Sequence, residues 1–160
     1  MKLARRAVAL VASLVFLAAL AASAAAQTDP QIGVWRINLA KSRYNTPPPK
    51  SATTKIEAAG AGTKVTVDQV ASDGTKRHYE FTSNYDGKEV KVTGNNPDAD
   101  TVARSRVDAH TIKTINKKDG KVTTTQTSTV SNDGKTRTVT TTGVNGAGAK
   151  VNNIAVYDKQ

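Results

Sequence analysis

The sequence contains no cysteine among its 160 residues. A disulfide and a thiolate metal ligand are therefore excluded, and packing and hydrogen bonds alone must hold the folded chain together. The two histidines, His78 and His110, lie on different segments and have no metal-ligand spacing to each other. We therefore expect no zinc site in this protein.

Signatures of catalysis are missing as well. No G-x-S-x-G nucleophile motif occurs, and no Gly-rich loop opens a helix that would hold a phosphate group. The stretch NNPDAD at 95–100 brings oxygen ligands close together, but it lacks the spacing and closing Glu of an EF-hand, so we expect an ordinary turn and no metal. The prediction is a non-enzymatic protein without a cofactor. A Ser-His-Asp site assembled from distant segments is the alternative, because geometry defines such sites.

A long apolar run lies near the N-terminus at residues 7–20. Basic residues precede this run, and the small-residue string AASAAAQ follows it. That order is typical of a secretory signal peptide, and the run is shorter than the roughly 20 residues that span a bilayer. Ala24 and Ala26 fit the A-x-A rule, which predicts a signal peptide at 1–26 and cleavage after Ala26. A retained membrane anchor is the alternative.

The remaining residues, 27–160, are expected to form one domain in the periplasm or outside the cell, in contact with the membrane only during export. The signal carries three of the 23 Lys and Arg residues and none of the 13 Asp and Glu residues, which leaves 20 basic against 13 acidic side chains. A basic balance suits anionic lipid, cell-wall polymer or nucleic acid. Because the basic residues are spread along the chain, we expect a solvated surface, no specific nucleic-acid partner and a monomer.

Asp-Gly pairs punctuate the rest of the chain. They separate segments in which apolar residues recur at every second position, the pattern of half-buried strands. Asp-Gly tolerates the positive φ angles of a type I′ turn, so each pair predicts a hairpin turn. The four pairs are Asp73-Gly74, Asp86-Gly87, Asp119-Gly120 and Asp133-Gly134.

The alternating segments predict about ten antiparallel strands. Val65 and Val67, for example, share one face of such a segment. No convincing helix follows the signal peptide, and NTPPP at 45–49 stops any regular element there. The expected fold is all-β, a single antiparallel up-and-down meander that closes into a barrel of about 8–10 strands. A sandwich is the alternative, but an open meander would expose two sheet edges.

The stretch GVW, Gly33 to Trp35, stands at the head of the first predicted strand and holds the only Trp of the chain. It resembles the G-x-W signature of the lipocalin and calycin group. The resemblance covers residues 30–160 and is closer to small secreted bacterial proteins of uncharacterised role with lipocalin-like folds, which share the layout GVWRINLAKSRY…PPP…YDGKEVKVTGNNPDADT…VNNIAVYDKQ. It implies that Trp35 is a structural plug at one end of the barrel and that Gly33 allows close backbone approach.

The same resemblance implies a small ligand in the barrel cavity, entered from the end opposite Trp35. In that group an Arg near the last strand stacks on the Trp. Residues 149–160 contain no Arg, which leaves Arg137 or Arg36 for this role. Segment 122–130, VTTTQTSTV, carries hydroxyl groups on both faces, so the lumen beside it suits a polar or amphiphilic ligand, or ordered water, better than a bare hydrocarbon.

Arg104 and Arg106 share one face of their predicted strand with Val102. If this face points inward, two guanidinium groups would bind a carboxylate or phosphate head group. The outward orientation is favoured because a buried, unpaired Arg is costly. If the two arginines point outward beside Lys91 and Lys113, they favour the alternative that the protein adheres to an anionic polymer.

The leading prediction is an exported carrier that binds a small amphiphilic or anionic molecule in the barrel cavity. Its predicted ligand-binding residues are Arg104, Arg106, Tyr79 and Phe81, of which the last two are expected in the core more than against a ligand. A barrel filled by Val-rich strands, with no cavity, is the alternative. Such a protein would be a non-enzymatic structural or interaction protein of the cell envelope that acts through its basic surface.

Overall fold

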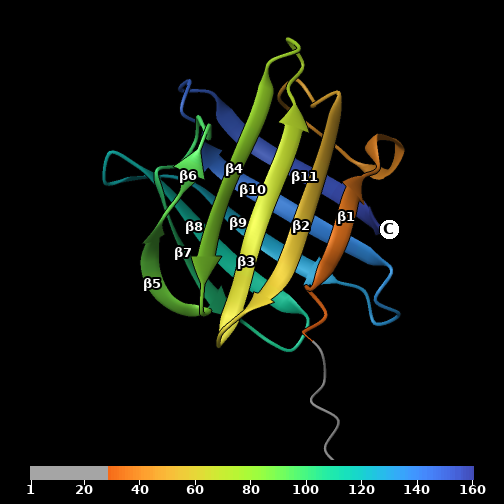
Figure 1. Cartoon of the computed structure of the whole chain (residues 1–160). Helices are drawn as coiled ribbons and strands as arrows, with labels where there is room; N and C mark the ends of the chain where they lie inside the picture. The colour runs from red at the N-terminus through yellow and green to blue at the C-terminus, as the bar shows by residue number, and fades with distance from the viewer. Residues whose placement is uncertain (1–28) are drawn as a thin grey trace, which may run out of the picture.

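The computed structural model describes residues 29–160, and the predicted signal peptide at 1–26 lies outside them. The described part folds into eleven strands and one short 3-10 helix (Figure 1). In chain order these are β1 (Gly33–Ile37), η1 (Leu39–Lys41), β2 (Ser51–Ala59), β3 (Gly62–Val70), β4 (Lys76–Ser83), β5 (Asp86–Lys91), β6 (Thr93–Gly94), β7 (Thr101–Arg106), β8 (Thr111–Lys118), β9 (Lys121–Val130), β10 (Thr136–Val144) and β11 (Lys150–Lys159).

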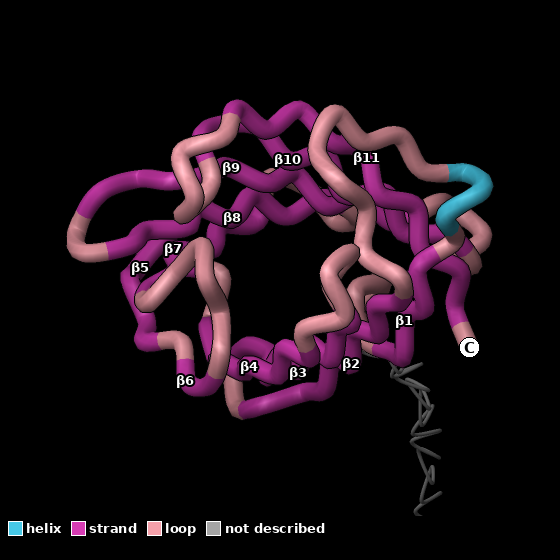
Figure 2. Tube along the Cα trace, turned by 90° about the horizontal axis from the view of Figure 1, so that it is seen from above, coloured by secondary structure: helices cyan, strands magenta, loops and turns pink. Residues whose placement is uncertain are grey.

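All the strands belong to one antiparallel sheet, in the order β5-β7-β8-β9-β10-β11-β1-β2-β3-β4-β6. Strand β1 lies between β11 and β2, so the first and last strands of the chain pair with each other. The sheet curls round until β4 and β5 lie near each other, and Figure 2 shows the resulting ring of strands. The predicted all-β meander is confirmed, and it forms a nearly closed barrel of eleven strands where about 8–10 were expected.

Burial alternates along the strands, as the sequence pattern predicts. In β2, Ala52, Thr54 and Ile56 are buried, while the residues between them are more exposed. Strand β8 repeats the pattern with Ile112 and Thr114. Many of the inward side chains are Thr, Ser or Asn, and apolar packing alone therefore cannot fill this barrel.

Three of the four Asp-Gly pairs lie in turns between paired strands, as predicted. Asp119 and Gly120 join β8 to β9 with φ angles of 50° and 73°, the positive values that a type I′ turn requires. Asp73-Gly74 and Asp133-Gly134 lie instead in longer loops. There the Asp carboxylate accepts a hydrogen bond from the backbone N–H two residues further along the chain.

The prediction of a hairpin turn at Asp86-Gly87 is wrong. This pair opens β5, which pairs with β7, while β4 pairs with β3 and β6. The chain leaves the β4 ladder through positive φ angles at Tyr85 (58°) and Gly87 (78°), and the register of β5 against β7 shifts between Asp86 and Glu89. Gly87 therefore lies in a β-bulge, at the place where the curled sheet brings β5 near β4.

Two hydrophobic clusters form the buried core. One contains Trp35, Ile56, Val65 and Val130, and the other contains Val92, Ala99 and Val102. The partly buried Phe81 packs against both clusters and connects them. Within residues 29–160, no helix is long and apolar enough to cross a membrane.

Candidate functional site

A cavity of about 360 Å³ lies inside the barrel. Strands β2 to β4 line one side of it and β7 to β11 line the other (Figures 1 and 2). The loops 45–49, 95–100 and 145–149 contribute further lining residues. Ligand pockets typically measure about 300–1,000 Å³, so the space suffices for one small molecule. The barrel is therefore not filled by its own side chains.

Arg104 points into this cavity from β7 and is only 3% exposed. Its Nη1 donates a hydrogen bond to Thr63 Oγ1 at 3.0 Å and lies 3.4 Å from Ser83 Oγ. Its guanidinium also lies over the Tyr85 ring, 4.6 Å from the ring centroid. Neutral hydroxyl groups and an aromatic face thus hold this cation, and burial lowers its pKa.

Arg137, on β10, is a second buried guanidinium at the same cavity, with 9% of its surface exposed. Its Nε donates to Ser128 Oγ at 2.7 Å and to Gln31 Oε1 at 3.2 Å. Burial lowers the pKa of Arg137 to about 10, and the positive charge of Arg104 acts in the same direction. Sequence reasoning considered Arg137 only as a partner of Trp35. The alternating pattern of the sequence could have identified Arg137, because alternation places this residue on the inward face of β10.

Neither buried guanidinium has a carboxylate partner. Seven ion pairs occur among residues 29–160, and none of them includes Arg104 or Arg137. In the same part of the chain, His110 Nδ1 is the one side-chain nitrogen or oxygen that is buried without a hydrogen-bond partner. The guanidinium nitrogens without a protein partner are therefore not sealed in the core. They reach the open space of the cavity, whose lining contains a single carboxylate, Asp98.

Arg106 does not join Arg104 in the cavity lining. It shares the strand face of Arg104 but is the last residue of β7. Its Nη2 donates to Asp29 Oδ2 at 2.6 Å, and its guanidinium lies over the Tyr85 ring at 4.5 Å from the centroid. The predicted arginine pair is thus divided: Arg104 lies in the lumen, and Arg106, at the end of β7, forms an ion pair with Asp29 of the N-terminal segment.

Tyr79 and Phe81 both line the cavity from β4. They also pack against the buried cluster around Val102, so a core role and a lining role coincide. Burial raises the pKa of Tyr79, and its hydroxyl group therefore stays neutral and able to donate a hydrogen bond at physiological pH. Contact of these two side chains with a ligand remains a prediction.

Trp35 is fully buried and lies outside the cavity lining, and its role as a plug remains a prediction. Its Nε1 donates to Gln31 O at 2.8 Å. The cation over its ring is Lys159, 5.1 Å from the ring centroid, and not Arg137 or Arg36. Lys159 is the residue paired with Trp35 across β1 and β11, so the ladder between the first and last strands supplies this cation.

Gly33 makes room for the same lysine. Its φ angle is 144°, and a Cβ atom at this position would lie 2.6 Å from Lys159 Cε. The sequence predicted a close approach of backbone at Gly33. The close approach is instead to a side chain, the one that covers Trp35.

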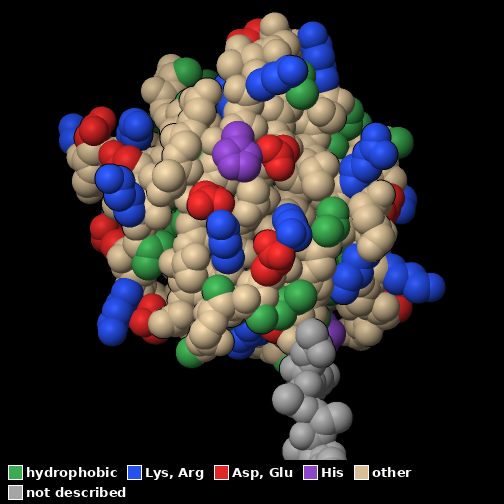
Figure 3. Space-filling model, in the orientation of Figure 1, with side chains coloured by type: hydrophobic (Ala, Val, Ile, Leu, Met, Phe, Trp, Pro, Cys, Tyr) green, Lys and Arg blue, Asp and Glu red, His purple; other side chains and the backbone are tan. Residues whose placement is uncertain are grey.

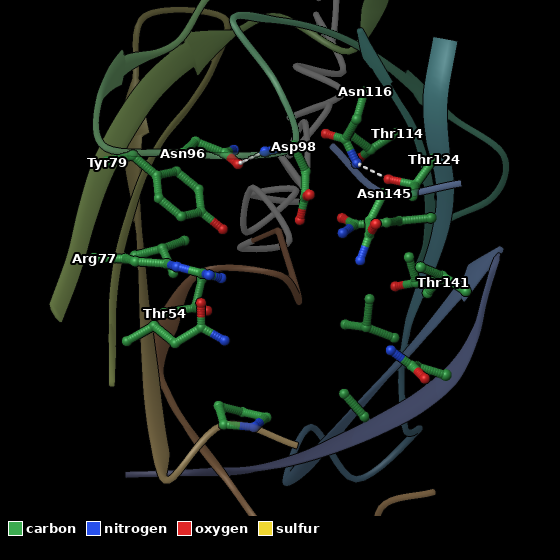
Figure 4. Close-up of a pocket in the computed structure, with 18 of the residues that line it drawn as sticks. Thr54, Arg77, Tyr79, Asn96, Asp98, Thr114, Asn116, Thr124, Thr141 and Asn145 are labelled. Atoms are coloured by element: carbon green, nitrogen blue, oxygen red, sulfur yellow. Dashed lines mark hydrogen bonds between the residues drawn. The ribbon is translucent and has the colours of Figure 1, made fainter. Parts of the chain in front are cut away.

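At the loops that border the cavity, hydrogen bonds hold Asp98 in place. Its backbone N–H donates to Asn96 Oδ1 at 2.9 Å (Figure 4), and its Oδ1 accepts from the Gly146 N–H at 2.9 Å. The stretch 95–100 thus makes contacts typical of a turn. Within residues 29–160, no group of three or more His, Cys, Asp or Glu could hold a metal ion.

Fold and site together define an all-β, antiparallel up-and-down barrel with a polar, positively charged cavity. No family model and no curated protein matches the chain. Among solved structures, the chain is similar to zebrafish ileal bile acid-binding protein complexed with cholic acid, with a TM-score of 0.46 and 14% identity over 82% of this chain and 99% of that chain. The fold assignment rests on the strand order of the sheet and not on this likeness.

Proposed function

We propose that this chain is an exported carrier that binds a small molecule with an anionic group inside the barrel. The observation that supports the proposal is the pair of buried guanidinium groups, Arg104 and Arg137, which line one cavity without a carboxylate partner. Export is supported by the signal-peptide pattern of residues 1–26. The ligand would neutralise the two cations.

Burial of an ionised side chain is costly, and buried charges are usually paired. In Arg104 and Arg137 the protein compensates this cost only with hydroxyl, amide and aromatic groups. A carboxylate or phosphate would accept charge-assisted hydrogen bonds from the remaining N–H groups, and its geometry matches the planar guanidinium fork. The cavity is therefore poised for an anion before any ligand arrives.

The other charges of the lining fit the same role. Arg77 and Asp98 also line the cavity, so three arginines stand against one carboxylate. The carboxylate of Asp98 already accepts a hydrogen bond from the Gly146 N–H. A net positive lumen of this kind attracts an anionic ligand and disfavours a cationic one.

Surface adhesion has less support. That alternative needed Arg104 outward beside Lys91 and Lys113, and Arg104 instead is buried. On the face shown in Figure 3, basic and acidic side chains are mixed, and Lys55–Glu57 and Lys64–Glu80 form ion pairs on β2 to β4. Paired charges of both signs do not make a patch for an anionic polymer.

The proposal is tested with matched anionic and neutral probes. We expect benzoate and phenyl phosphate to raise the melting temperature of residues 27–160, and benzyl alcohol to leave it unchanged. Arg104→Gln combined with Arg137→Gln should abolish the anion effect. Arg106→Gln, which removes a cation outside the lining, should retain it. Equal anion effects in the wild type and the double variant would overturn the proposal.

A further inference from the structure

A continuous row of polar side chains crosses one wall of the cavity from β7 to β11. Each member is the direct register partner of the next, on adjacent strands, and each lines the cavity. Adjacent strands lie about 4.7–4.9 Å apart, so this polar row offers a hydrogen-bonding group at each such step, with a guanidinium at one end. In order, the polar row is Arg104, Thr114, Gln126, Thr141 and Asn153.

The middle of the polar row has unused hydrogen-bonding capacity. Among residues 29–160, the side chains of Thr114, Gln126 and Thr141 form no hydrogen bond with one another or with a neighbour, whereas beside them Asn116 Nδ2 donates to Thr124 Oγ1 at 2.9 Å. Water can satisfy these groups while the cavity is empty. A hydrocarbon ligand would displace that water and leave the hydroxyl and amide groups without partners, which is unfavourable.

The opposite wall contains an apolar block, which lies next to the polar lining residues Gln69 and Arg77 of the same two strands. Val65 pairs with Phe81, and Val67 pairs with Tyr79, so four cavity-lining side chains form one block on β3 and β4. Figure 4 shows Tyr79 on one side of the cavity and Thr114, Thr124 and Thr141 on the other. Such a pair of walls fits a ring whose C–H face packs on aromatic and aliphatic groups while its hydroxyl groups face the polar row.

We infer that the ligand is a polyhydroxylated ring with one carboxylate or phosphate, a sugar acid in chemical class, and not an alkyl-chain acid. This inference rests on the proposed function, because Arg104 and Arg137 would hold the anionic group. The ring would lie between the polar row and the apolar block. The cavity volume of about 360 Å³ suits a compact ring of this kind.

Calorimetric titration with D-glucuronate and cyclohexanecarboxylate tests the inference, because both carry one carboxylate on a six-membered ring and only the first carries hydroxyl groups. We expect glucuronate to bind residues 27–160 at least tenfold more tightly. Gln126→Leu combined with Thr141→Val, which removes two register partners of the polar row, should weaken glucuronate at least tenfold and leave cyclohexanecarboxylate unweakened.

The matched control is Thr127→Leu combined with Thr140→Val, a register pair on the same two strands that does not line the cavity. This variant should bind glucuronate like the wild type, and circular dichroism melts confirm that both variants fold. Tighter binding of cyclohexanecarboxylate or decanoate, still dependent on Arg104 and Arg137, would overturn the sugar-acid inference and leave the carrier proposal standing. Failure of every anion to bind would overturn the carrier proposal itself.

Discussion

Arg104 and Arg137 face the same cavity from β7 and β10, and neither forms an ion pair with a residue of the range 29–160. Each is held by uncharged groups, Arg104 by Thr63 and Arg137 by Ser128. Two like charges in one lumen repel each other, and the pKa of Arg137 is lowered partly for this reason, after burial. Under the proposed function, an anionic ligand would offset the cost that the two buried charges impose on the empty barrel.

A counterion built into the wall should compete with the ligand. Thr114 lines the cavity and is the register partner of Arg104, because β7 pairs with β8. We predict that Thr114→Asp lowers the affinity for benzoate at least about tenfold and stabilises the empty protein by about 1 kcal/mol, since the new carboxylate pairs with Arg104. Calorimetric titration and urea unfolding measure the two effects.

The control for this substitution is Thr114→Asn, which has the shape of the Asp variant without its charge. It should keep most of the benzoate affinity and give no gain in stability. Equal losses of affinity in the Asp and Asn variants would show that side-chain size, and not charge compensation at Arg104, determines the result.

Gln31 joins the N-terminal segment to the buried network around Arg137. Its Nε2 donates to His110 O at 2.8 Å, and its Oε1 accepts from Arg137 Nε at 3.2 Å. Because Gln31→Ala removes these buried hydrogen bonds and empties a fully buried site, we predict a loss of about 2–3 kcal/mol in the free energy of unfolding. Gln69→Ala, which removes a cavity-lining side chain with no such bonds, should cost less than about 0.5 kcal/mol. Urea unfolding compares them, and similar losses would contradict the network.

Trp35 and Lys159 make separable contributions to stability where β1 pairs with β11. Trp35→Ala empties a fully buried site and should cost about 3–5 kcal/mol. Lys159→Ala removes a cation from the Trp35 ring and should cost about 0.5–1 kcal/mol, while Lys159→Arg retains most of that contribution. Thermal and urea unfolding of the three variants measure these losses. If Lys159→Arg were as destabilising as Lys159→Ala, the result would contradict this account.

Acid should destabilise the protein through carboxylates that accept hydrogen bonds, here Asp133 in a turn and Asp158 on β11. Hydrogen bonds from Ser131 and Lys135 lower the pKa of Asp133, and those from Asn38 and Lys41 lower the pKa of Asp158, each from an ordinary value of 3.8. Because the folded pKa lies below the unfolded one, this stabilisation is present above pH 3.8 and is lost as the pH falls through the folded pKa.

Urea unfolding at pH 6, 4 and 3 measures this dependence. Asp133→Asn combined with Asp158→Asn should flatten the fall in stability between pH 4 and 3, because an amide does not titrate. A fall of the same steepness in this variant would assign the acid sensitivity to other groups.

The fold was predictable because local patterns carry it. Alternation marks the strands, and Asp119-Gly120 marks a two-residue turn through its positive φ angles. The prediction at Asp86-Gly87 was wrong because the dipeptide indicates a local bend and does not indicate which strand pairs with the one that follows. That partner, β7, lies further along the chain, across the β6 crossover.

The site was predictable only in part, for reasons of register. Alternation puts Arg104 and Arg106 on one face, but it does not show that Arg106 pairs with Asp29 and lies outside the cavity lining. Arg137 is the single Arg of a Thr-rich strand. It shares a cavity with Arg104 only because of the way in which several strands pair between them. Lys159 meets Trp35 because the two ends of the chain pair, a long-range contact that no local pattern reports.

The most direct test of the anion-carrier account is native mass spectrometry of residues 27–160, exported with their own signal and purified gently. The account predicts an additional mass that is lost on denaturation, belongs to an anionic compound, persists in Arg106→Gln and is absent when Arg104→Gln and Arg137→Gln are combined. An additional mass that the double variant retains unchanged would contradict it, because the bound molecule would then owe nothing to the two buried guanidinium groups.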